Sequence, residues 1–329
     1  MLSRNNHYLS QMYLKNWSTD NKVEVYELLV PNSNYPIYNS KSIKGVGSYN
    51  SMYVRLSNNV EIDDIEHMFS TDYETPAKVS LDKAVQGEKL SYEDWYKLID
   101  LIACHIVRSP KYIFQVLETG RKETPKILKT LKEEIGDLKV YKSPIEEPIS
   151  FPINITKEEH EDYTDFKIET IIGKQVYLHT MNNMLKTIKE RLHKENWSII
   201  TLDESVQVPT TDNPVVFLNY YDANNYNLNG NINTKDSNIL FPISPNKIIC
   251  CQIGKKTKRR ITANKELSEL LKKVIVENAY RIVISKDKDL EIPLIRDRVV
   301  DEQLFLEEKT SWSNFQKTYL EEESKYIKH

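Results

Sequence analysis

Glycine and cysteine are scarce in this sequence, whose 329 residues include 8 glycines and 3 cysteines. It contains no glycine-rich loop that would cradle a phosphate group, no paired-histidine zinc motif and no nucleophile elbow. Cys250 and Cys251 are adjacent and cannot easily bridge each other, and with Cys104 they form no spaced zinc set. We therefore expect three reduced, mostly buried thiols.

Long apolar runs are also missing. No segment reaches the roughly 20 apolar residues that a membrane-spanning helix needs, and the first residues lack the apolar stretch of a secretory signal. The sequence therefore predicts a cytoplasmic protein without a membrane partner. The net charge of -3 gives no overall field for nonspecific nucleic-acid binding, so a local basic patch would have to provide it.

The periodicity of apolar residues predicts an α+β fold in one domain over residues 1–329. Apolar and polar residues alternate over 22–27, as in a half-buried strand. The predicted helices cover residues 62–85, 92–117, 126–138, 158–192 and 265–280, and the later strands cover 198–202, 215–218, 248–253 and 281–285. The expected fold is a largely helical N-terminal two thirds, packed with a mainly antiparallel sheet from the C-terminal third and an N-terminal strand. Three prolines within residues 143–152 indicate a loop or a subdomain hinge.

Polar and aromatic side chains gather in the opening run from His7 to Trp17. If this run forms a helix, His7 and Gln11 share a face with Leu14, and an imidazole and an amide point into one cavity. The functional interpretation is a general base or a ligand with its orienting amide. The alternative is a packed N-terminal helix with a core histidine.

Two charged residues stand in largely apolar surroundings. Glu74 has apolar neighbours in a predicted helix, and with Glu66 it would provide paired carboxylates for a divalent cation or for acid and base roles. The alternative for these acids is a solvated helix face. Arg108 interrupts the nearly continuous apolar run 98–110, and a buried arginine needs a carboxylate or a phosphate beside it. We expect an ion pair with an internal acid such as Glu74 or Asp212, an anion-binding role, or both.

Two further segments are candidates for a site. The turn from Val208 to Phe217 places Asp212 and Asn213 before an apolar strand. These side chains either bond the local backbone or belong to an active-site loop, with Asp212 as acid, base or metal ligand. The basic run 255–260 would steer a phosphate backbone, but it has no interleaved aromatic residues, and a solvated hairpin loop is the alternative.

The order and spacing of these segments extend over most of the chain. The segments are His7-Tyr8 with Gln11 and Tyr13 to Trp17, Glu74, the stretch 103–110 with Arg108, Thr211 to Val215, and Phe241 to Pro245. Together they resemble domain of unknown function family 4238, with Leu9-Ser10, Trp17 and Thr211 replacing the usual Val-Pro, Phe and Ser. The resemblance implies a shared site formed by the motif positions His7, Gln11, Glu74, Arg108, Asp212 and Asn213.

The residues and the resemblance lead to two functional hypotheses. In the first, the protein is a metal-assisted hydrolase of a phosphate-containing substrate, nucleic acid or nucleotide, in bacterial stress or phage defence. His7 would be the general base, Glu74 and Asp212 would hold Mg²⁺ or Mn²⁺, and Arg108 would neutralise the phosphate. In the second, the protein is a noncatalytic sensor module that binds an anion or a protein partner. A purely structural role for the motif is a third hypothesis.

Overall fold

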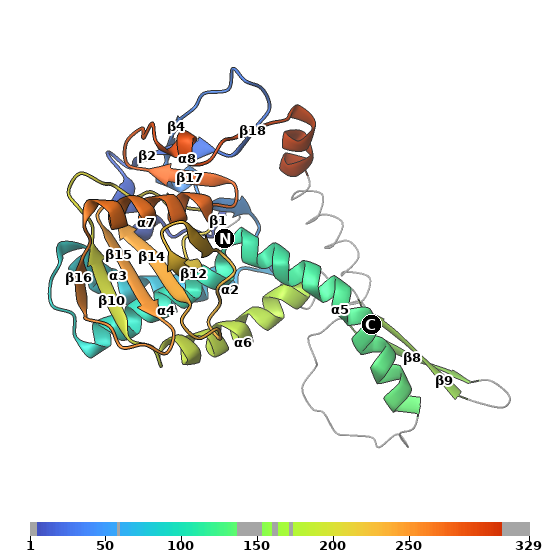
Figure 1. Cartoon of the computed structure of the whole chain (residues 1–329). Helices are drawn as coiled ribbons and strands as arrows, with labels where there is room; N and C mark the ends of the chain where they lie inside the picture. Colours follow the sequence, from blue (N-terminus) through green and yellow to red (C-terminus); the bar gives the residue numbers. More distant parts are fainter. Residues whose placement is uncertain (1–4, 58–59, 137–152, 160–163, 171–173, 311–329) are drawn as a thin grey trace.

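A six-stranded sheet forms the centre of the computed structural model, which describes residues 5–57, 60–136, 153–159, 164–170 and 174–310 (Figure 1). From edge to edge its strands are β13 (Asn225–Asn227), β12 (Val216–Asp222), β14 (Asn238–Ser244), β15 (Lys247–Gln252), β10 (Trp197–Thr201) and β16 (Arg260–Thr262). Neighbouring strands are antiparallel except β10 and β16, which are parallel.

Helices cover both faces of this sheet. They are α3 (Thr75–Gln86) and α4 (Tyr92–Arg108) on one face, and α7 (Lys265–Glu277) on the other. In β15, Ile249 and Cys251 belong to the core on the α4 side, whereas Ile248 and Cys250 belong to the core on the α7 side. Because both faces of the strand are buried, its sequence is a continuous apolar run.

A second sheet and several strand pairs complete the fold. The four-stranded sheet has the order β11 (Thr210–Thr211), β17 (Ile282–Ser285), β2 (Lys22–Glu27) and β4 (Asn39–Ser42). The strand pairs are β1 (Asn5–His7) with β5 (Ser48–Asn50), β3 (Leu29–Val30) with β18 (Val299–Val300), β6 (Arg55–Ser57) with β7 (Val60–Ile62), and β8 (Ile153–Glu159) with β9 (Thr164–Thr170). Further helices are α1 (Gln11–Leu14), α2 (Asp64–Met68), α5 (Pro110–Gly136), α6 (Lys174–Leu192) and α8 (Ile292–Ile295), with a π-helical segment at Phe69–Glu74 and 3₁₀ turns at Lys15–Trp17 and Ile43–Gly45. Residues 302–310 are also helical.

The α+β class predicted from the sequence is confirmed, and several elements lie where the periodicity places them. Strand β2 matches the alternating run, and α4 begins after Ser91. The Ser91 hydroxyl accepts the Asp94 backbone N–H at 3.1 Å, and the Asp94 carboxylate accepts the Ser91 N–H at 2.9 Å. This reciprocal pair is a capping box, which fixes the start of the helix.

Three predicted helices differ from the structure. The helix predicted over 92–117 is divided at Ser109, which is extended (ψ 136°) because Pro110 disfavours a helical residue before it. The part after Ser109 belongs to α5, which also includes most of the helix predicted over 126–138. The one over 62–85 contains the π-helical segment Phe69–Glu74. The prediction over 158–192 is wrong for its first part, where β8 and β9 form an antiparallel hairpin.

The opening run is also different from its prediction. His7 lies in β1, and the helix begins only at Gln11, because Ser10 is extended and its hydroxyl accepts the Tyr13 backbone N–H. His7 and Gln11 therefore do not share a helix face. The expected hinge at 143–152 lies outside the described residues. Among the helices that the structure describes, none is long and apolar enough to cross a membrane.

Candidate functional site

Arg108 is almost fully buried, at 1% exposure, in the last turn of α4. Its guanidinium donates to the Glu74 carboxylate and to the backbone carbonyl of His7, and lies 3.6 Å from the Cys104 Sγ. The guanidinium carbon is 4.5 Å from the centre of the Phe69 ring. The internal carboxylate that the sequence requires for Arg108 is therefore Glu74, at the end of the π-helical segment.

His7 is held by its backbone and by its ring. Its backbone N–H donates to the Glu66 carboxylate at 3.4 Å, and its Nε2 lies 3.2 Å from the Lys44 carbonyl. Burial lowers the pKa of His7, and the Arg108 charge lowers it further. Because a carbonyl oxygen only accepts hydrogen bonds, Nε2 carries the proton of the neutral ring. Only Nδ1 is then left to act as a base.

Asp212 is buried and bonds to the backbone at the start of β17. Its Oδ1 accepts the Tyr280 N–H at 2.8 Å, and its Oδ2 accepts those of Arg281 at 2.6 Å and Ile282 at 3.2 Å. Burial raises the pKa of Asp212 to about 6, and the three backbone donors oppose that shift. These contacts are those of a carboxylate that orders a chain turn.

Asn213 joins the same region to the end of α7. Its side-chain amide donates to the Asn278 carbonyl at 3.1 Å, while the Asn278 amide donates to the carbonyls of Asn213 at 2.8 Å and Val215 at 3.2 Å. Asn278 therefore joins the C-terminal end of α7 to the turn that contains Asn213. The Asp212–Asn213 turn and the α7–β17 connection order each other.

The motif residues thus divide into three places. His7, Glu74 and Arg108 meet, whereas Asp212 and Asn213 bond to residues 278–282. Gln11 lines a separate cavity of about 770 Å³, together with Lys15, Lys44 and Lys78. Glu74 and Asp212 bind different partners, and the described residues contain no group of three or more His, Cys, Asp or Glu suited to a metal ion. The metal-binding role of Glu74 and Asp212 stays a prediction.

The aromatic part of the opening motif anchors the N-terminal segment to the sheets. The Tyr13 hydroxyl donates to the Pro242 carbonyl at 2.8 Å and bonds the Thr210 hydroxyl at 2.6 Å. The Trp17 indole donates to the Val208 carbonyl at 2.9 Å. These bonds satisfy buried polar groups on both sides, so Tyr13 and Trp17 have packing roles.

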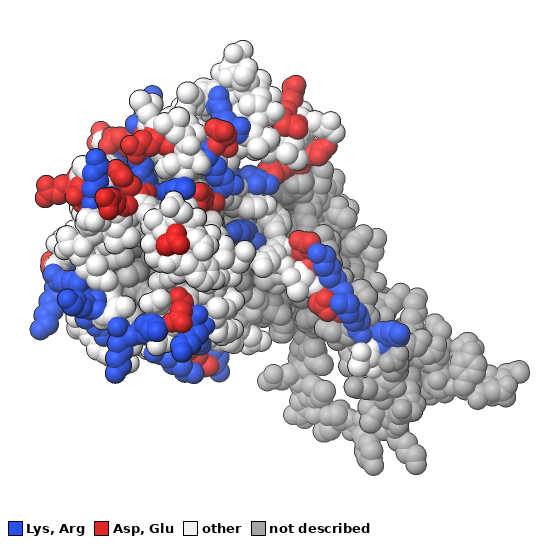
Figure 2. Space-filling model, in the orientation of Figure 1, with Lys and Arg blue, Asp and Glu red and all other residues white. Residues whose placement is uncertain are grey.

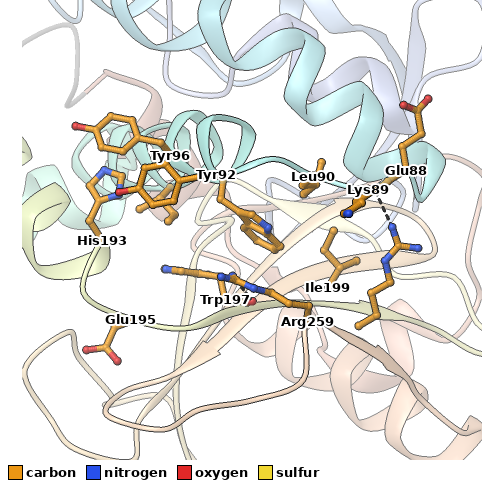
Figure 3. A pocket seen from close by; sticks show the side chains of 13 residues that line it. Glu88, Lys89, Leu90, Tyr92, Tyr96, His193, Glu195, Trp197, Ile199 and Arg259 are labelled. Atoms are coloured by element: carbon orange, nitrogen blue, oxygen red, sulfur yellow. Dashed lines mark hydrogen bonds between the residues drawn. The ribbon is translucent and has the colours of Figure 1, made fainter.

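A cavity of about 400 Å³ lies between the start of α4, the end of α6, and strands β10 and β16. Figure 3 shows Tyr92, Tyr96 and His193 on its aromatic side. Trp95 also lines the cavity. Its cationic side chains are Lys89, Arg259 and Arg260. We call this cavity the aromatic–basic cleft.

Three of the four aromatic rings of the cleft, those of Trp95, Tyr96 and His193, contact described neighbours. The ring of Tyr96 stacks on that of His193, with centres 4.1 Å apart and an interplanar angle of 17°. His193 Nε2 is 2.8 Å from Asp100 Oδ1. The other carboxylate oxygen of Asp100 pairs with Lys189 at 2.8 Å. The guanidinium carbon of Arg259 lies 5.1 Å from the centre of the Trp95 ring. Tyr96, His193 and Arg259 therefore each have a ring or charged partner.

The two acids of the cleft do not neutralise its cations. Glu195 pairs with Arg191 and accepts the Gly254 backbone N–H at 2.7 Å. The Glu88 carboxylate points away from the cleft in Figure 3, and its backbone carbonyl accepts a bond from Arg260 at 2.7 Å. The cleft therefore presents a positive charge beside its rings.

The sequence prediction missed this cleft. The basic run 255–260 was identified, but its aromatic partners come from residues 92–96, far away in the sequence. A local signal was present: Tyr92 and Tyr96 are four residues apart at the start of a helix and so share one of its faces.

The fold and the cleft define an α+β protein with an open, ligand-sized cavity that combines aromatic and cationic side chains. The chain belongs to the family described as protein of unknown function (DUF4238), whose model matches residues 5–289 and so includes the motif residues and the cleft. No curated protein and no solved structure matches the chain.

Proposed function

We propose that the protein is a noncatalytic binding module for an anionic ligand that carries a planar ring, a nucleotide in the simplest case. The observation that carries this proposal is that exposed tyrosine rings and arginine side chains line the same cleft. The sequence also suggested an anion-binding module, with Arg108 and the Asp212 turn as the binding residues. The present proposal keeps that function but assigns the binding to the aromatic–basic cleft. We propose that the protein binds this ligand in the cytoplasm.

Exposure of the rings supports stacking of a ligand. Tyr92 is 86% exposed and Tyr96 is 44% exposed. Contact of either ring with another flat ring would be favourable, because it would remove apolar surface from water and add stacking. Stacking of a base on an aromatic side chain contributes about 1–3 kcal/mol. The cavity of about 400 Å³ is within the size range of small-ligand pockets.

The cations of the cleft suit a phosphate group. Arg259 donates one described hydrogen bond, to the Trp197 carbonyl at 3.1 Å, and Arg260 donates one to the Glu88 carbonyl at 2.7 Å. A guanidinium has five N–H donors in a planar fork, so each of these side chains has further donors for phosphate oxygens. Lys89 adds a third positive charge.

Calorimetric titration of the full chain with ADP, GDP, CDP, UDP and inorganic phosphate tests the proposal. At least one nucleotide should bind, more tightly than phosphate alone. Tyr92→Ala should weaken that binding roughly five- to 150-fold because it removes one stacking surface, whereas Tyr92→Phe should keep it.

Tyr221→Ala is the matched control, because Tyr221 is also an exposed tyrosine, at 67%, and lies in β12, toward the edge of the sheet opposite β16. If no nucleotide binds, or if Tyr92→Ala and Tyr221→Ala weaken binding equally, the cleft is not a nucleotide site.

The hydrolase hypothesis has less support from the geometry. Arg108 already bonds Glu74 and the His7 carbonyl, and Asp212 bonds three backbone donors, so neither presents its charge to a substrate. Incubation of the protein with RNA, DNA and nucleotides in Mg²⁺, Mn²⁺ or EDTA tests it directly. Metal-dependent cleavage would support the hydrolase hypothesis and contradict the proposal of a noncatalytic module.

A further inference from the structure

The segment after β15, up to the first residue of β16, extends the positive charge beyond the cleft. Five of residues 255–260 are lysine or arginine, and all six are exposed. The last two, Arg259 and Arg260, line the cleft itself. In Figure 2, Lys and Arg side chains gather along the lower left edge of the molecule, around the positions of β10 and β16 in Figure 1. The cationic surface is therefore larger than the cleft.

We propose that the ligand is a single-stranded nucleic acid, with one base stacked in the aromatic–basic cleft and the following phosphates on the basic loop, residues 255–260. This rests on the proposed function, since it uses the same cleft. A lone nucleotide carries its phosphates close to its ring and cannot cover the loop. Successive phosphates of a strand would match a row of lysines.

The lysines of the loop differ in their availability. Lys255 lies 3.2 Å from the Asp236 carboxylate, and both side chains are about half exposed. Lys256 and Lys258 have no ion pair among the described residues. They are therefore the two loop lysines best placed to bind phosphate oxygens.

The exposed tyrosines discriminate against a duplex. In double-stranded DNA or RNA each base is paired and stacked between its neighbours, so its face cannot reach Tyr92 and Tyr96 without unstacking. Bases of a single strand are free to turn outward. The net charge of -3 also means that attraction comes from this local surface and not from the whole molecule.

Fluorescence anisotropy with labelled 12-nucleotide DNA and RNA strands, the matching duplexes, and ADP as competitor tests the inference. The strands should bind the full chain at least tenfold more tightly than the duplexes, and the comparison of DNA with RNA identifies the source of the strand. Tyr92→Ala should weaken strand binding.

Lys256→Ser combined with Lys258→Ser should weaken strand binding about tenfold at low salt and reduce the slope of log Kd against log salt concentration by about 1.4, because two phosphate contacts are lost. Nucleotide binding should stay unchanged. The control is Lys286→Ser with Lys288→Ser, which removes two exposed lysines at the same spacing from the loop after β17.

The outcomes separate the two proposals. If nucleotides bind in the cleft but strands bind no more tightly than duplexes, or the Lys256/Lys258 variant equals its control, the single-strand inference is wrong and the nucleotide module remains. If strands bind but Tyr92→Ala has no effect, the cleft is not the strand site. Absence of binding to nucleotides and strands alike overturns both.

Discussion

Arg108 and Glu74 form an ion pair in which the guanidinium is 1% exposed and the carboxylate 20% exposed. Arg108 also donates to the His7 carbonyl, so a single side chain connects α4, the π-helical segment and β1. A carboxylate of a fourth element, Glu66 in α2, accepts the His7 backbone N–H. Burial raises the pKa of Glu66 and the Arg108 charge opposes that shift. The motif residues at this place hold the N-terminal segments together.

Removal of Arg108 should strongly destabilise the protein. Arg108→Met leaves the Glu74 carboxylate and the His7 carbonyl without their donor, at an expected cost of about 3–5 kcal/mol in the free energy of unfolding. Arg108→Lys keeps the charge but not the forked geometry, and should cost less. Urea denaturation measures both. A midpoint for Arg108→Met equal to that of the wild type would exclude this structural role.

Asp212→Asn should destabilise the start of β17. An asparagine offers only one acceptor oxygen to the three N–H groups of residues 280–282, and its own NH₂ faces a donor. The expected loss is about 1–3 kcal/mol, the range for a buried polar group without a partner. Asp82→Asn, at an exposed position in α3, is the control. Equal melting temperatures for the two variants would contradict the assignment.

Stability should depend on pH through Asp212. The pKa of this carboxyl is raised from 3.8 to about 6, so the folded state binds its proton more tightly than the unfolded state. The contribution is fully present below pH 4 and is lost as the pH rises through 6, by up to about 3 kcal/mol. The unfolding free energy of the wild type minus that of Asp212→Asn, measured between pH 4 and pH 7, isolates this group. A difference that is constant over this range would disprove the raised pKa.

Tyr13→Phe tests the anchoring of the opening motif. The substitution keeps the ring that stacks on Phe241, with centres 5.0 Å apart, but deletes the hydroxyl that bonds Thr210 and the Pro242 carbonyl. We expect a loss of about 1–3 kcal/mol in unfolding free energy, because buried groups lose their partner. Tyr92→Phe, at an exposed position, should leave the thermal midpoint unchanged.

The three cysteines should not react in the folded protein. Burial raises the pKa of the Cys104 and Cys250 thiols to about 12, and that of Cys251 further. The reactive thiolate is therefore almost absent at neutral pH. Iodoacetamide followed by mass spectrometry should detect no modification in buffer and three modified cysteines in urea. Rapid labelling of a cysteine in buffer would show that its surroundings open.

Local patterns in the sequence predicted the elements whose cause is local. Strand β2, the start of α4 and helix α7 follow from alternation, from the Ser91 cap and from helical spacing, all of which act within a few residues. The hairpin of β8 and β9 was missed because the helical spacing of the apolar residues within 177–188, which lie in α6, was extended back to residue 158. The hairpin depends on the pairing of its strands, a nonlocal event.

The sequence by itself determined that Arg108 has a carboxylate or an anion beside it, because burial of an unpaired guanidinium is too costly in free energy. Only the tertiary structure decided that the partner is Glu74, that Asp212 bonds the backbone of residues 280–282, and that Tyr92 and Tyr96 lie beside the basic run. The composition and local spacing of a segment determine which chemical groups it can present. Which distant segments combine that chemistry depends on how α4 packs on the sheet, and this is a property of the whole core.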